Sequence, residues 1–188
     1  VPLGTVKPQE YKEHPWVVAG SVFKPGYIGG WSAAEYWEFT EQIFKSIVVF
    51  TLRRYRKKKM QVQGTDFVLK FINQKYFGKT KQVWIENTKI AVADPIQTIV
   101  DILDDPAIGG GMRNISDIVR EYFESKYRDD EAMVKYIEAR NNKTIYKRLG
   151  YIIETTKIDA SKLKETCMKN ISKGFSLLDP TADSKGSF

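Results

Sequence analysis

The hydrophobic and polar positions divide the chain into a part with strand-like alternation and a later part with helical spacing. Residues 46–92 hold short β-branched and aromatic runs, and the alternate positions Phe67, Leu69 and Phe71 place apolar side chains on one face of a strand. From Asp94 onward, apolar residues recur at every third or fourth position. The pattern predicts an α+β fold: short N-terminal helices, a mainly antiparallel sheet over 46–92, and a C-terminal helical half over 94–172.

Within the sheet part, four or five strands joined by short turns are expected. The runs 47–52 and 62–72 are rich in β-branched and aromatic residues, and a turn at 64–66 interrupts the second. Two shorter runs, 83–85 and 90–92, are separated by four polar residues, which suits a hairpin.

Two short helices are expected before the sheet. A proline at the first turn supports a helix over 15–23. Ser32 and Glu35 have the spacing of a capping box, which predicts an aromatic-rich helix over 32–40. The proline and glycines of 24–30 predict a loop between them.

In the second half, Asp94 followed by Pro95 is expected to cap a helix. The glycine triplet 109–111, just before Arg113, could bind phosphate through backbone N–H groups, but a helix connector is the preferred interpretation. Further helices are expected over 113–126, 129–140, 143–156 and 159–172.

Length and composition predict one compact domain. The chain has 188 residues, of which 42% are hydrophobic and 13% aromatic. We expect a lead-in at 1–10, a domain over 11–173 and a loose tail at 174–188. One cysteine and one histidine exclude an internal disulfide and two-histidine metal sites. No apolar run could span a membrane, so a cytoplasmic protein without metal or cofactor is expected.

The net charge of +7 comes from the middle of the chain, where residues 41–90 hold 12 basic and 3 acidic side chains. Two interpretations of its densest run stay open: contact with phosphates or an acidic protein face, and a solvated loop between two strands. The run consists of Arg53, Arg54, Arg56, Lys57, Lys58 and Lys59.

Other reactive side chains have structural interpretations. His14 is expected near the surface and Cys167 as a structural thiol, since no second histidine could activate it. The carboxylate pairs 104–105 and 129–130 fall at helix ends and suit capping. Tyr27 and Trp31 stay open between core packing and stacking on bases.

The segment around Gly150 is expected to be partly structural. A glycine inside a helix costs about 1 kcal/mol relative to alanine, so Gly150 should face a neighbouring element closely. Lys147 and Arg148 beside it are candidate nucleic-acid or partner contacts, although solvated side chains are the preferred interpretation.

Three segments together resemble the C-terminal region of the AbiEi-like antitoxins, transcriptional regulators of bacterial and archaeal toxin–antitoxin (abortive-infection) systems. They are residues 27–37, 93–103 and 147–154, with a strand pair and residues 77–78 between the first two. Their order and spacing match as well, and the resemblance spans residues 1–180.

The resemblance implies a two-domain regulator: a winged helix that binds the promoter, and a C-terminal domain that neutralises a nucleotidyltransferase-like toxin without necessarily binding it stably. Residues 1–4 resemble the exit from the winged helix, so that domain is expected to be absent here. The family usually continues past residues 177–180 into another strand, which this chain does not show.

Two functions from different classes are therefore carried forward. The first is a non-enzymatic antitoxin domain of a transcriptional repressor, with DNA phosphates as a partner in the intact regulator. The alternative is a nucleic-acid- or nucleotide-processing enzyme that uses the basic 53–59 segment. The missing acid–base and metal set favours the first, and the oligomeric state stays open.

Overall fold

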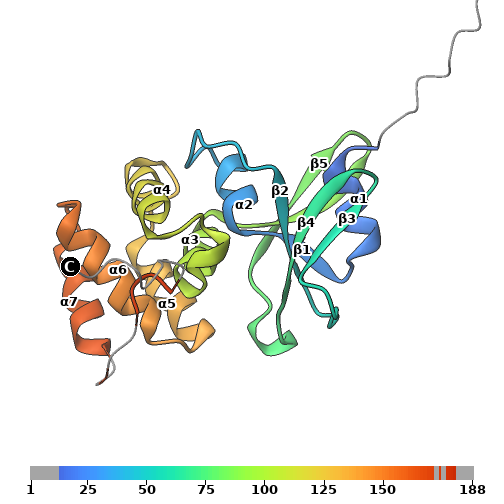
Figure 1. Ribbon diagram of the computed structural model, residues 1–188. Helices are drawn as coiled ribbons and strands as arrows, with labels where there is room; N and C mark the ends of the chain where they lie inside the picture. Colours follow the sequence, from blue (N-terminus) through green and yellow to red (C-terminus); the bar gives the residue numbers. More distant parts are fainter. Residues whose placement is uncertain (1–12, 172–173, 175–176, 181–188) are drawn as a thin grey trace, which may run out of the picture.

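The computed structural model describes residues 13–171, 174 and 177–180 and shows two adjoining lobes (Figure 1). We call residues 13–93 the sheet lobe and residues 94–180 the helical lobe. The α+β prediction is confirmed. The expected lead-in at 1–10 lies outside the described residues.

The sheet lobe is built on six strands in the order β3-β4-β2-β1-β6-β5. They are β1 (Gly26–Ile28), β2 (Ser46–Thr51), β3 (Lys59–Val62), β4 (Thr65–Phe71), β5 (Thr80–Ile85) and β6 (Thr88–Ala93). The pairs β1–β2, β3–β4 and β5–β6 are antiparallel, whereas β2–β4 and β1–β6 are parallel.

The sheet is mainly antiparallel, as expected, but it is mixed, because two of its five strand pairings are parallel. β4 lies between β2 and β3 in the sheet. After β2, the chain therefore passes the end of β4 and forms β3 on the side of β4 that faces away from β2. Alternation of apolar side chains tells which face of a strand is buried, not which strand lies beside it.

Strand β1 was missed altogether, because its segment reads as a proline- and glycine-rich loop. It lies inside the sheet, between β2 and β6. A Cβ atom on Gly26 would lie 2.4 Å from the carbonyl oxygen of Phe50 on β2. Glycine is thus required here by the close approach of two backbones, not by a turn.

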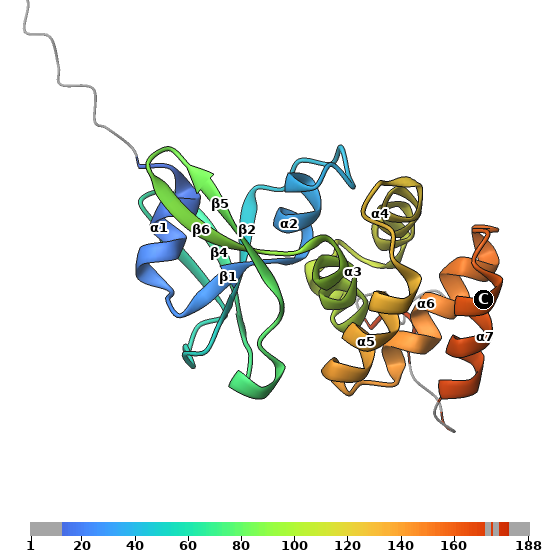
Figure 2. The same cartoon turned by 180° about the vertical axis from the view of Figure 1, so that it is seen from behind.

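Two short helices cover opposite faces of the sheet (Figures 1 and 2): α1 (Pro15–Val22) on the outer face and α2 (Gly30–Tyr36) toward the helical lobe. The prediction of α1 is confirmed. α2 begins earlier than expected, with Gly29 at its N-cap. Ser32 lies inside the helix instead of capping it, and its hydroxyl accepts a 3.1 Å hydrogen bond from the Val48 amide.

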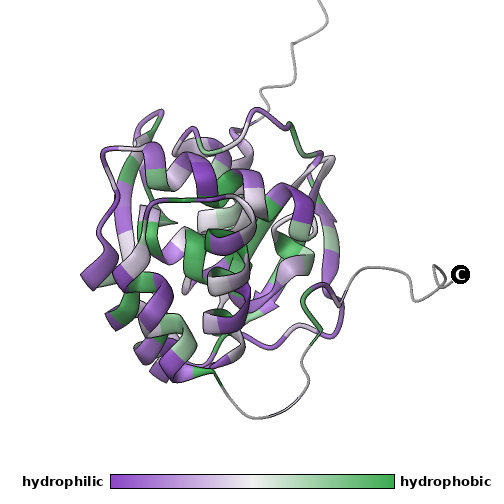
Figure 3. Ribbon diagram, turned by 90° about the vertical axis from the view of Figure 1, so that its left-hand side faces the viewer, coloured by the Kyte–Doolittle hydropathy of each residue, from purple (hydrophilic) through white to green (hydrophobic). Residues whose placement is uncertain are grey.

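The helical lobe contains all five helices that the sequence predicts. They are α3 (Pro95–Asp104), α4 (Met112–Glu124), α5 (Asp130–Arg140), α6 (Thr144–Thr155) and α7 (Ser161–Asn170). Asp94 caps α3 by accepting a 2.8 Å hydrogen bond from the Gln97 amide. Hydrophobic and hydrophilic residues are interspersed along these helices (Figure 3). Two single turns of 3₁₀ helix, η1 (Gln74–Tyr76) and η2 (Pro106–Ile108), join the larger elements.

Each lobe has its own hydrophobic core, and Trp37 packs against both. Its indole Nε1 donates a 2.8 Å hydrogen bond to the carbonyl of Ala93, the last residue of β6. Tyr27 and Trp31, which the sequence left open, are buried in the sheet core. Both are therefore core residues, and neither forms an exposed stacking platform.

Candidate anion-binding surface

The basic run lies in the connection between β2 and β3. We call residues 52–58 the basic loop. Arg53, Arg54, Arg56, Lys57 and Lys58 are all exposed in it, and the exposed Lys59 begins β3. The sequence prediction that this run forms an exposed loop at a strand end is confirmed.

The backbone of the basic loop is anchored where it passes the end of β4. The amide of Leu69 donates a 2.7 Å hydrogen bond to the carbonyl of Lys58, and the amide of Ile72 donates to Thr51 at 3.0 Å. At the start of the loop, the Arg53 amide donates to the Thr51 hydroxyl at 3.1 Å. These bonds fix the backbone at both ends of the loop, while its charged side chains stay exposed.

A pocket of about 310 Å³ opens between the basic loop and the end of β4. The guanidinium of Arg54 lies 4.0 Å above the ring of Phe71, whose side chain is 41% exposed. The lining contains no carboxylate and consists of Thr51, Arg53, Arg54, Tyr55, Lys57, Lys58, Leu69, Lys70 and Phe71.

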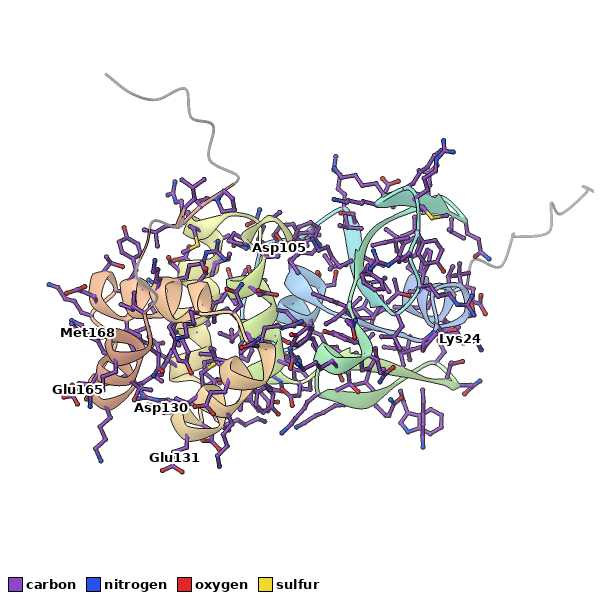
Figure 4. All side chains as sticks on the ribbon, turned by 90° about the horizontal axis from the view of Figure 1, so that it is seen from below. Lys24, Asp105, Asp130, Glu131, Glu165 and Met168 are labelled. Atoms are coloured by element: carbon purple, nitrogen blue, oxygen red, sulfur yellow. The ribbon has the colours of Figure 1, made fainter. Side chains whose placement is uncertain are left out.

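Lys70 is the cation of this pocket that has a carboxylate partner. It forms an ion pair with Asp105, which follows α3 at the boundary between the lobes (Figure 4). Among the residues that the structure describes, none of the cations from Arg53 to Lys59 forms an ion pair. The surface can therefore take up several negative charges, because four cations of this pocket have no carboxylate partner among the described residues.

Arg148 is not part of such a surface, and its place among the candidate contacts was wrong. It is 6% exposed, and its guanidinium donates to the carbonyls of Leu103 and Asp104 at the end of α3, at 2.6 and 2.9 Å. It also donates to the carbonyls of Leu178 and Leu177, at 3.0 and 3.2 Å. Burial lowers the pKa of this guanidinium.

The expectation of a loose tail therefore does not hold for residues 177–180. Besides the two bonds from Arg148, the side chain of Asp179 accepts a 3.0 Å hydrogen bond from the amide of Met112, at the start of α4. Residues 175–176 and 181–188 lie outside the part that the structure describes. Lys147 points to this segment too, since its ammonium donates to the carbonyl of Gly174.

The remaining reactive side chains have structural roles. The Nδ1 atom of His14 accepts a 3.1 Å hydrogen bond from the Trp16 amide and caps α1. Cys167 is fully buried, and burial raises the pKa of its thiol to about 12. Asp129 accepts from the Ala132 amide at 2.9 Å, as its capping prediction required.

Gly150 faces α7, as expected from its place inside α6. A Cβ atom on Gly150 would lie 3.3 Å from the Cβ of Cys167. We expect Gly150→Leu to lower the free energy of unfolding by about 1–3 kcal/mol through overpacking. Gly150→Ala should be nearly neutral, because a helix-propensity gain of about 1 kcal/mol offsets the tighter contact. Urea denaturation measures both, and a leucine variant as stable as the wild type would contradict this packing.

A buried polar network lies at the boundary between the lobes, and the sequence pattern did not predict it. The carboxylate of Asp101, on α3, is fully buried and forms an ion pair with Arg140 on α5. It also accepts hydrogen bonds from the hydroxyl of Tyr27, on β1, at 3.1 Å and from the side-chain amide of Gln97 at 2.7 Å. Burial lowers the pKa of Arg140 and raises that of Tyr27.

No local signal in the sequence indicates this network. Asp101 lies 39 residues from Arg140 and 74 residues from Tyr27 along the chain. By helical spacing Asp101 falls on the polar side of α3, opposite the stripe of Ile99, Val100 and Leu103, and it is buried nevertheless.

The described residues contain no group of three or more histidine, cysteine, aspartate or glutamate side chains that could hold a metal ion. Within the same residues, no helix is long and apolar enough to cross a membrane. A scan against models of protein families and a search of curated proteins found no match to this chain.

Proposed function

We propose that this chain is a non-enzymatic regulatory module of the antitoxin type, whose basic loop binds the phosphates of nucleic acid. The observation that supports the proposal is the pocket beneath the loop, whose lining has no carboxylate and holds four cations without a carboxylate partner among the described residues. Phosphate contacts of this kind supply affinity and position, and carry little sequence information.

Arginine and aromatic side chains in this pocket suit a phosphate backbone better than a flat acidic surface. The guanidinium groups of Arg53 and Arg54 can each make two parallel hydrogen bonds to one phosphate. The ring of Phe71 holds the Arg54 guanidinium from below, which limits the conformational freedom that binding must remove.

The antitoxin role rests on the three segments that resemble the AbiEi-like proteins. We propose that the chain neutralises a nucleotidyltransferase-like toxin in the cytoplasm and that the basic loop assists DNA binding in the intact regulator. Co-expression with the product of a neighbouring nucleotidyltransferase-like gene, scored for growth rescue and for co-purification, tests this role. Growth arrest that persists although the chain is expressed and folded would contradict the antitoxin role.

The nucleic-acid role is tested with two variants that remove the same charge from different surfaces. The loop variant changes four pocket cations to glutamine: Arg53, Arg54, Lys57 and Lys58. The control variant changes four exposed lysines of the helical lobe to glutamine: Lys143, Lys157, Lys162 and Lys169. At low salt, we expect the loop variant to bind a generic duplex about 100-fold more weakly, and the control variant to keep most of the affinity. Fluorescence anisotropy measures both.

Four results would change the interpretation. An equal loss in both variants would mean that net charge alone attracts DNA. Retained DNA affinity with lost growth rescue in the loop variant would point to an acidic protein partner. Full retention of both would show that the loop is only solvated. Turnover of a nucleotide or nucleic acid by the wild type, lost in the loop variant, would favour the alternative of a processing enzyme.

A further inference from the structure

A second basic pocket, which we call the inter-lobe pocket, lies between the two lobes. It has a volume of about 150 Å³ and opens where residues 75–79 of the sheet lobe meet α3 and α5. Its lining consists of Lys75, Tyr76, Phe77, Gly78, Lys79, Gln97, Lys135, Tyr136, Ala139 and Arg140.

Three lysines in this lining have charges that no carboxylate neutralises. Lys75 and Lys79 come from the sheet lobe and Lys135 from α5, and all three are exposed. In the described ranges, none of them forms an ion pair. The ammonium of Lys79 lies 4.5 Å from the centre of the Tyr136 ring, so a cation of the sheet lobe already contacts the helical lobe.

The fourth cation, Arg140, is engaged by other groups. It pairs with Asp101 and lies 3.7 Å from the carboxylate of Asp104, so its charge is neutralised inside the protein. A ligand would therefore be held by the lysines at the mouth, and Arg140 would form part of a fixed wall.

The rest of the wall is rigid and closely packed. The side chain of Gln97 is buried, accepts a 3.2 Å hydrogen bond from the Lys79 amide and donates to Asp101. A Cβ atom on Gly78 would lie 2.6 Å from the Gln97 side chain. A side chain at position 78 would therefore displace Gln97, so the packing of Gly78 against Gln97 helps to set the shape of the pocket.

We propose that the inter-lobe pocket binds a phosphate group that bridges the two lobes. Its volume is about half of the lower limit for drug-sized ligands, roughly 300 Å³, so a compact anion fits. A phosphate carries close to two negative charges at neutral pH and three acceptor oxygens. It can therefore accept from lysines on both lobes at once. The group can belong to inorganic phosphate or to the end of a nucleotide whose remainder stays outside.

The test uses the full chain and three probes: inorganic phosphate, pyrophosphate and a nucleoside monophosphate. Titration calorimetry at constant ionic strength, carried out in the loop-variant background so that the basic loop does not compete for the probes, should show one saturable site per chain. Lys75→Gln and Lys135→Gln should each weaken binding by about tenfold, since each removes a charge-assisted hydrogen bond. Lys162→Gln, on the exposed face of α7, removes one charge elsewhere and should leave binding unchanged.

The relative affinities distinguish the sources of the phosphate. Equal binding of all three probes supports free phosphate as the ligand, and tighter binding of the nucleotide supports a terminal phosphate. The inter-lobe site should persist in the loop variant, which lacks four cations of the basic loop, so this proposal can fail or hold independently of the proposed function. The absence of saturable binding up to millimolar probe, or binding that survives both lysine changes, would overturn it.

Discussion

Asp101→Ala is expected to lower the free energy of unfolding by about 3–5 kcal/mol, because it leaves Arg140 buried without its main counter-ion. The hydroxyl of Tyr27 and the amide of Gln97 also lose an acceptor inside the protein. Asp104, at 3.7 Å, keeps a weak electrostatic contact with Arg140, which favours the lower end of this range. Urea denaturation followed by circular dichroism measures the change.

Two further variants show whether the loss comes from the unpaired charge. Asp101→Ala combined with Arg140→Met removes both charges and should recover part of the stability. Asp117→Ala removes an exposed carboxylate that pairs with Arg120 on the surface of α4, and should change stability by no more than about 0.5 kcal/mol. A loss below about 1 kcal/mol for Asp101→Ala would contradict the role of the network.

Arg148→Ala should lower the free energy of unfolding by about 2–4 kcal/mol. The guanidinium is the shared donor for four backbone carbonyls, two of them at the end of α3. Hydrogen bonds to a charged group contribute about 1.5–3 kcal/mol each, but the carbonyls of residues 177–178 can turn to water once they are released. The expected loss of stability is therefore smaller than the sum of four such contributions.

A second readout of Arg148→Ala is local. The amide hydrogens of residues 177–179 should exchange faster, and the segment 177–180 should be cleaved sooner by protease, than in the wild type. Arg148→Lys keeps the charge but offers one ammonium in place of a planar fork, so it should restore the stability only in part. Unchanged exchange at 177–179 in the alanine variant would show that other contacts hold this segment.

The sequence predicted the helical lobe well and the sheet only in part, for a physical reason. Helix periodicity and caps such as Asp94 are local, so each helix can be identified from its own residues. Strand neighbours are chosen by contacts far apart in the chain, and the parallel pairing of β2 with β4 leaves no local trace. β1 was not predicted because a glycine usually indicates a turn, whereas Gly26 is needed for a close contact between two backbones.

The candidate surface also had a part that local sequence predicts and parts that depend on long-range contacts. The basic loop could be identified because a run of unpaired charges is too costly to bury. Arg148 was misplaced because a single arginine can satisfy backbone carbonyls inside the protein, and its sequence neighbours do not reveal them. The inter-lobe pocket combines Lys75, Lys79 and Lys135, which only the packing of the two lobes brings together.

The salt dependence of duplex binding tests most directly whether the basic loop contacts phosphates. For the wild type, the loop variant and the control variant, the association constant for one generic duplex is measured across a series of salt concentrations. The association constant falls as salt rises, and each phosphate contact makes the slope of log K against log salt steeper by about 0.9. The slope of the loop variant should therefore be shallower than that of the wild type by about 3–4. The control variant should keep the slope of the wild type. A loop variant whose slope equals that of the wild type would contradict the proposal that these four side chains bind phosphates.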